Sequence, residues 1–124
     1  MKTIRSGKMF QGGESRSFTI FPLRIVFMPA TEQEVPLSMM VSVSKRHFKR
    51  AVKRNRVKRL VREAWRLHKQ PLADLLSMQQ KKLAVVLIYL ADELPTYATI
   101  EQRVQTAILR LCEYHKPKED ETPA

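Results

Sequence analysis

The sequence has a single cysteine, Cys112, in 124 residues. One thiol can form no internal disulfide and no cysteine cluster for zinc, so we expect a reducing compartment, the cytoplasm. Long apolar runs are also missing. The longest, residues 83–91, has the length of a strand and falls short of the roughly 18 residues of a membrane span. Residues 1–13 contain no run that resembles a signal peptide, and we expect no membrane association.

Acidic residues are almost absent from residues 45–69, which hold 12 of the 23 Lys and Arg residues and one acid, Glu63. The segment therefore carries a formal charge of +11, and the remaining 11 basic and 11 acidic side chains cancel. A basic run is often only a solvated surface. A charge excess confined to one segment instead favours a polyanionic partner, which is nucleic acid or an anionic membrane surface.

The sequence also lacks a constellation that could perform catalysis. His47, His68 and His115 have no metal-ligand spacing, and no nucleophile lies near a candidate base. Asp92 and Glu93 could form a metal-binding pair, but a solvated strand end is the better interpretation. We expect no catalytic residue and no protein-bound metal.

The hydrophobic pattern predicts an α+β fold, with helices packed on one small sheet. A helical turn or two at residues 4–10 should end at Gly12 and Gly13. Pro22 should place part of the strand at 17–28 on an edge or at a bulge, and Pro71 should end the basic helix. The other expected elements are a hairpin loop at 29–36, strands at 37–44 and 83–91, and helices at 48–69, 72–78 and 95–114.

The expected helix at 48–69 has two distinct stripes. Its apolar stripe is Val57, Leu60, Val61, Ala64 and His68, with Trp65 at the margin. The opposite stripe is Asn55, Arg59, Arg62, Arg66 and Lys69, flanked by Lys58, and its spacing of three and four places it on one face. Such a helix can dock on a core and still present cations to phosphates, for which arginine is well suited.

This basic helix resembles a known signature. Residues 53–66, KRNRVKRLVREAWR, are similar to the RNR motif of bacterial ribonuclease P proteins. Residues 41–46 and 49–52 resemble the strand and loop that lead into that helix. Residues 10–13 and 21–24 resemble the end of the family's first helix and its first strand. The resemblance covers residues 4–112.

The resemblance implies a single-domain αβββαβα sandwich with a small four-stranded sheet. It also implies a left-handed crossover between parallel strands, where general rules favour a right-handed one. The domain should span residues 1–115, and residues 116–124 should form a disordered tail.

The resemblance further implies two RNA-binding surfaces. The catalytic RNA should be bound by Lys45, Arg46, Lys49, Arg50, Lys53, Arg54, Asn55, Arg56, Lys58, Arg59, Arg62 and Arg66. The single-stranded 5′ leader of precursor tRNA should lie on one sheet face and the first helix. The candidates there are Phe10, Phe18, Phe21, Arg24, Ser42 and Ser44, although a phenylalanine in a strand is more often a core residue. Unpaired RNA is gripped by aromatic stacking beside positive charge.

The expected activity is removal of the 5′ leader by a ribonucleoprotein endoribonuclease. Its RNA subunit carries the chemistry with Mg²⁺, and no obligate protein partner is expected. The alternative is a structural RNA-binding protein, such as a ribosomal component with a basic helix buried in rRNA. The two hypotheses differ in the second, leader-binding surface, which a ribosomal protein does not need.

Overall fold

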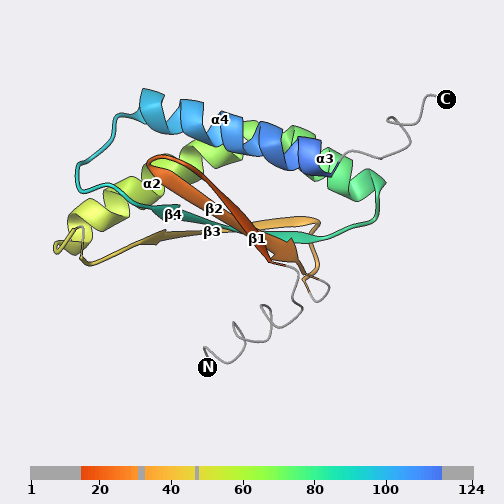
Figure 1. The fold of residues 1–124 in the computed structure, drawn as a ribbon, viewed down its shortest axis with the longest axis horizontal. Coiled ribbons are helices and arrows are strands. Elements are labelled where there is room, and N and C mark those ends of the chain that lie inside the picture. The colour runs from red at the N-terminus through yellow and green to blue at the C-terminus, as the bar shows by residue number, and fades with distance from the viewer. Residues whose placement is uncertain (1–14, 31–32, 47, 116–124) are drawn as a thin grey trace.

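The computed structural model describes residues 15–30, 33–46 and 48–115. They form a sheet of four strands and a layer of helices, which lie together on one side of the sheet (Figure 1). In chain order the elements are β1 (Arg16–Ile20), β2 (Leu23–Pro29), β3 (Leu37–Val43), α2 (Ala51–His68), α3 (Gln70–Met78), β4 (Leu83–Tyr89) and α4 (Tyr97–Tyr114). The predicted α+β class is confirmed. The predicted first helix and the tail at 116–124 lie outside the described residues.

The sheet has the order β1-β2-β4-β3. β3 runs parallel to β4, and the other neighbouring strands are antiparallel. β4 is therefore an interior strand, with β2 on one side and β3 on the other. Val85 and Leu87 on its helix-covered face are buried, whereas Val86 and Ile88 on the other face are only half-buried.

Alternation along β2 separates the two faces of the sheet. Leu23, Ile25 and Phe27 are buried against the helices, and Arg24 between them is exposed on the opposite face. The same pattern continues in β3, where Val41 and Val43 are buried and Ser42 is exposed. The core thus lies between one sheet face and the helices, and no described helix covers the other face.

The helices close the core with apolar residues at helical spacing. α2 buries Val57, Val61, Ala64 and Trp65, so the predicted margin residue Trp65 belongs to the core. α4 begins after Thr96, whose hydroxyl oxygen accepts a hydrogen bond from the backbone N–H of Thr99 (3.3 Å) and so caps the helix. It buries Ile100, Val104, Ala107, Ile108 and Leu111. No helix in the described ranges is long and apolar enough to cross a membrane.

The strand predicted at 17–28 is in fact two strands. Phe21 and Pro22 form the turn between β1 and β2, which pair with each other from Arg16 with Phe27 to Ile20 with Leu23. Pro22 has no N–H to donate to a ladder, and the chain reverses there without a bulge. The part of the predicted strand before it, β1, is an edge strand of the sheet, as the first of the two predicted outcomes requires.

The hairpin predicted at 29–36 is wrong, because β4 lies between β2 and β3. The loop crosses the end of β4, and Gln33 holds it there. The side-chain amide of Gln33 donates to the carbonyl oxygens of Val35 (2.9 Å) and Leu83 (3.0 Å), and its oxygen accepts from the hydroxyl of Ser38 (2.8 Å).

The connection from β3 to its parallel neighbour β4 runs through α2 and α3. Its left-handed sense remains a prediction. Pro71 lies in the first turn of α3, just after α2 has ended at His68, so the predicted helix break is confirmed. The crossover places the first turn of α2 beside the carboxyl ends of both strands, where the basic segment begins.

Candidate nucleic-acid interface

The loop between β3 and α2 is anchored by Phe48. Its ring is buried and stacks on Tyr89 at the end of β4, with ring centroids 6.1 Å apart. Its backbone N–H donates to the carbonyl oxygen of Ser44 (3.2 Å). Burial raises the pKa of Tyr89, whose hydroxyl donates to the carbonyl oxygen of Glu93 (2.6 Å). This anchor fixes a loop whose basic side chains, Lys45, Arg46, Lys49 and Arg50, are exposed.

Arg54, in α2, binds the backbone of this loop. Its guanidinium donates through Nη1 to the carbonyl oxygens of Phe48 (2.7 Å) and Lys49 (3.0 Å). The side chain is turned back toward the backbone and half-buried. Arg54 was predicted to bind the catalytic RNA, and the structure gives it a structural contact as well.

The outward face of α2 presents the other predicted cations. Lys58 is half-buried, and the exposed residues are Lys53, Asn55, Arg56, Arg59, Arg62 and Arg66. Arg59 and Arg62 form no ion pair with an acid in the described part of the chain. Because Val57, Val61 and Ala64 are buried on the opposite side, the helix cannot rotate to hide this charge. The face is fixed by the core and available to phosphates.

Arg66 is the member of this face that has an acidic partner. Its Nη2 lies 2.7 Å from Oε2 of Glu63, one turn earlier. The hydrogen bond from Arg66 lowers the pKa of the Glu63 carboxyl, and Glu63 in turn raises the pKa of Arg66. The ion pair reduces the charge that Arg66 offers to an external anion.

The first turn of α2 carries no acid and no side-chain cap. Arg50 occupies the N-cap position in an extended conformation, and its side chain accepts no hydrogen bond from the helix. The free N–H groups and the positive end of the helix dipole point toward the same region as Lys49, Arg50 and Lys53. Such an end attracts phosphate. A hollow of about 390 Å³ lies beside it, bordered by these cations and by Asp92 and Glu93.

The uncovered face of the sheet brings Arg24 and Ser42 onto one row. Both residues are in register with Ile88 of β4, which lies between them. They are thus two strands apart, about 10 Å, and not in adjacent strands as predicted. The next row joins Val26, Val86 and exposed Met40. This apolar strip beside Arg24 was not singled out from the sequence. The even-numbered residues of β2, β3 and β4 all lie on this uncovered face of the sheet.

The other predicted leader contacts do not all join this row. Ser44 lies just after β3, and its hydroxyl accepts a hydrogen bond from the backbone N–H of Arg46 (3.0 Å). Phe18 lies on the helix-covered face, edge-on to Phe27 (6.0 Å) and below the guanidinium of Arg110 (5.4 Å). Phe21 is exposed in the β1–β2 turn. Phe10 is outside the described residues.

The described ranges hold no group of three or more His, Cys, Asp or Glu side chains that could bind a metal ion. His68 is instead half-buried between α2 and α4, where its Nε2 lies 2.8 Å from Oε2 of Glu101. The expectation that the protein itself binds no metal stays a prediction.

Comparison with known proteins gives a consistent result. A family model for ribonuclease P matches residues 5–112. The ribonuclease P protein component of Porphyromonas gingivalis strain W83 is 46% identical over 100 residues, which cover 80% of this chain and 73% of the relative. The component from Acinetobacter baylyi is 32% identical over 90 residues, covering 72% and 69% of the two chains.

Solved structures show the same fold. The RNase P protein of Staphylococcus aureus superposes with a TM-score of 0.65 at 17% identity, covering 94% of this chain and 95% of the other. The RNase P protein of Thermotoga maritima, in complex with 1-(4-fluorophenyl)-2-thiourea, gives 0.65 at 20% identity, covering 89% and 98%. These comparisons favour the first of the two hypotheses over a ribosomal component. The chain therefore belongs to the ribonuclease P protein family, the protein subunits of a ribonucleoprotein endoribonuclease that processes the 5′ ends of tRNA.

Proposed function

We propose that the exposed basic face of α2, together with the loop at residues 44–50, forms the contact with the catalytic RNA. The observation that carries this proposal is the fixed presentation of charge. Val57 and Val61 are fully buried in the core, and Arg59 and Arg62 are exposed on the other side of the same helix. Each arginine can form paired hydrogen bonds with a phosphate. On a face of mixed charge, neighbouring acids would compete with the phosphate for the same guanidinium groups.

The uncovered sheet face is the proposed site of the precursor tRNA leader. Arg24 supplies a cation and Ser42 a small polar side chain on one row. Val26, Val86 and Met40 supply an apolar surface next to them, against which unpaired bases can pack. Phe10 remains a proposed stacking residue on this surface, and Phe21 lies at its end in the β1–β2 turn. Phe18 is the weakest candidate, because it faces the helices.

The division of labour follows from these surfaces. The protein reduces the repulsion between two polyanions and holds the leader, and Mg²⁺ on the RNA subunit supplies the chemistry of phosphodiester hydrolysis. We propose that this ribonucleoprotein acts in the cytoplasm and needs no second protein.

The test compares precursor and mature tRNA binding by the assembled ribonucleoprotein at one fixed salt and Mg²⁺ concentration. Arg24→Ala should weaken precursor binding by about tenfold, the equivalent of one charge-assisted contact, and leave mature tRNA binding unchanged because mature tRNA has no leader. Phe10→Ala should act in the same direction. Lys69→Ala removes a cation between α2 and α3, in the helical layer beyond the other face of the sheet, and is the control. An unchanged precursor-to-mature ratio in a folded Arg24→Ala protein contradicts the proposed leader site.

A further inference from the structure

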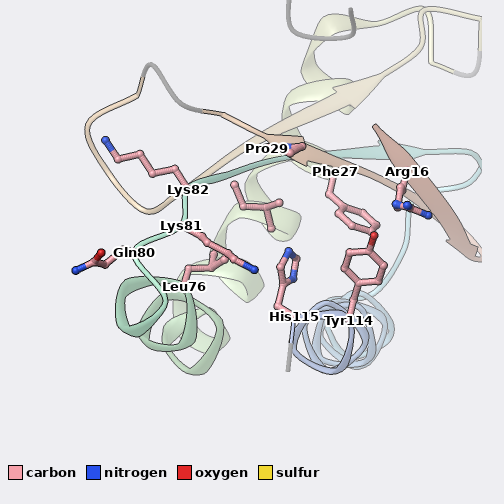
Figure 2. A pocket seen from close by; sticks show the side chains of 10 residues that line it. Arg16, Phe27, Pro29, Leu76, Gln80, Lys81, Lys82, Tyr114 and His115 are labelled. Atoms are coloured by element: carbon pink, nitrogen blue, oxygen red, sulfur yellow. The ribbon is translucent and has the colours of Figure 1, made fainter. Parts of the chain in front are cut away.

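A second cavity, of about 570 Å³, lies at the end of the sheet away from the basic loop. It is bordered by the end of β2, the start of β4 and the last turn of α4 (Figure 2). Leu83 at this cavity and Tyr89 beside the loop at 44–50 are the two ends of β4, about 20 Å apart. The cavity is therefore separate from the proposed contact with the catalytic RNA. Its volume lies within the usual range for sites that bind small molecules.

Three aromatic rings form one wall of this cavity. Tyr114 meets Phe27 edge-to-face with centroids 5.1 Å apart, and it meets His115 at 5.1 Å in the same manner. Phe27 is buried, whereas Tyr114 is half exposed. The wall is thus anchored in the core on one side and offers ring surface to a ligand on the other.

Among the described residues, cations border the cavity and no acid does. They are Arg16, Lys81 and Lys82. The guanidinium of Arg16 lies over the Tyr114 ring, 5.4 Å from its centroid. The ammonium of Lys81 points toward His115, while that of Lys82 points away from the rings (Figure 2). None of the three forms an ion pair with an acid in the described ranges.

The turn after α3 fixes the backbone of Lys81. The backbone N–H of Lys81 donates to the carbonyl oxygen of Leu76 (2.9 Å), and the backbone N–H of Gln80 donates to the carbonyl oxygen of Ser77 (3.0 Å). This is a Schellman motif, whose left-handed position is commonly glycine. Here Gln80 adopts a φ of 57°, a conformation that costs a non-glycine residue free energy. The turn therefore directs Lys81 toward the cavity on a defined backbone.

His115 is held in place on the opposite side. Its Nδ1 donates to the carbonyl oxygen of Leu111 (2.8 Å), so Nδ1 carries the proton and Nε2 is left as the second polar atom of the ring. Its own carbonyl oxygen accepts from the side-chain amide of Gln79 (2.6 Å). An oriented imidazole beside an ammonium suits a ligand with both a ring and an anionic group.

We propose that this cavity binds one unpaired nucleotide of RNA. The base packs against Tyr114 and His115, and the phosphate lies between Lys81 and Arg16. A base has the flat apolar surface that the rings match, and a phosphate has the charge that the cations match. The site is a third RNA contact, and it does not depend on the proposed roles of α2 or of the uncovered sheet face.

The first test is an NMR titration of the full chain with uridine 5′-monophosphate, and separately with inorganic phosphate. The nucleotide should produce saturable shifts at Phe27, Lys81, Tyr114 and His115, and phosphate alone should act mainly at Lys81. Tyr114→Ala should weaken nucleotide binding at least about fivefold and Lys81→Gln about threefold, because the first removes stacking and the second removes one cation. Lys69→Gln, which removes a cation between α2 and α3 outside the cavity, should have no effect. Shifts confined to α2 or to the uncovered sheet face, or unchanged affinity in folded Tyr114→Ala and Lys81→Gln, overturn the proposal.

The second test identifies the source of the nucleotide. A photo-reactive benzoyl-phenylalanine at position 114 is irradiated in the ribonucleoprotein assembled with precursor tRNA, and the cross-linked RNA is sequenced. Cross-linking to the catalytic RNA or to the precursor tRNA supports the site and names its partner. The same group at position 59 reports on α2 alone, so failure of the basic face is seen separately. Absence of any RNA cross-link from position 114 overturns the third contact.

Discussion

At the scale of single residues, Glu63 restrains the most basic surface of the molecule. It is the one acid in residues 45–69, and it holds Arg66 at 2.7 Å. We predict that Glu63→Gln strengthens binding to the catalytic RNA by about twofold to fivefold. The freed Arg66 should steepen the slope of log affinity against log salt by up to about 0.7–0.9. Glu34→Gln, which removes an exposed acid from the loop before β3, is the control for net charge and should have less effect. An unchanged slope would mean that Arg66 faces no phosphate.

The same pair gives a defined dependence of stability on pH. The pKa of Glu63 is lowered in the folded protein, chiefly by the hydrogen bond from Arg66. Its contribution to folding is therefore present above the ordinary glutamate pKa and disappears as the pH falls through the lowered value. Glu63→Gln should abolish this dependence. Thermal melts of both proteins from pH 7 down to pH 3 measure the difference, which should be confined to the acidic end.

Arg54 shows how one residue of a basic run can differ from its neighbours. Because its guanidinium bonds to two loop carbonyl oxygens, we predict that Arg54→Ala lowers the free energy of unfolding by about 1–2 kcal/mol. The neighbouring exposed Arg56→Ala should leave stability unchanged. Urea unfolding of the two variants makes the comparison. Equal stability of the two would show that the Arg54 hydrogen bonds contribute nothing to the fold.

The sequence could place the exposed cations of α2, because spacing of three and four defines a helix face. It could not separate Arg54 from that set, since its partners are backbone carbonyl oxygens whose positions depend on the Phe48 anchor. Phe18 illustrates the same limit. Phe18 pairs with Ile25 and therefore points to the same, helix-covered side of the sheet. This pairing depends on the reversal of the chain at Pro22.

At the scale of elements, α2 begins with a cation at its N-cap position, where a capping side chain would stabilise the helix more. Arg50 is an N-cap residue that cannot accept a hydrogen bond from the helix, and a cation at this end is unfavourable for the helix dipole. We predict that Arg50→Ser stabilises the protein by about 1 kcal/mol, since serine caps well, and at the same time weakens binding to the catalytic RNA. Arg50→Ala removes the cation without adding the cap, so only its RNA affinity should fall. If serine and alanine give the same melting temperature, the N-cap position is not limiting.

Most helices and strands could be predicted from periodicity, whereas the order of the strands in the sheet could not. The basic helix was predicted at 48–69 and is observed as Ala51–His68, and the apolar run at 83–91 is the interior strand β4. The placement of β4 between β2 and β3 was missed because a loop of hairpin length suggests adjacent strands. Strand order depends on pairing between residues far apart in the chain, such as Met28 with Ala84, and no local pattern encodes it.

At the scale of the whole molecule, the surfaces proposed for the catalytic RNA and for the leader lie on different parts of one small core, apart from the cavity beside Tyr114. The uncovered sheet face presents Arg24 and Met40, and α2 presents its cations from the helical layer. Within the part of the chain that the structure describes, neither surface brings together a nucleophile and a base. We predict that the isolated protein, freed of RNA by nuclease treatment, cleaves no precursor tRNA, and that activity returns when the catalytic RNA is added with Mg²⁺. Specific 5′ cleavage by the RNA-free protein would place the chemistry in the chain itself.

The central role of the α2 face is tested most directly by the salt dependence of binding to the catalytic RNA for Arg59→Ala, Arg62→Ala and Arg66→Ala, measured beside their melting temperatures. Arg110→Ala is the matched control. We predict that each α2 variant binds more weakly and that its slope of log affinity against log salt is shallower by about 0.7–0.9 for each phosphate that the variant can no longer neutralise. The effect at Arg66 should be the smallest of the three because Glu63 already pairs with it. Melting temperatures should stay near that of the unaltered protein. A sharp fall in melting temperature with an unchanged slope would show that these arginines support the fold and do not bind RNA.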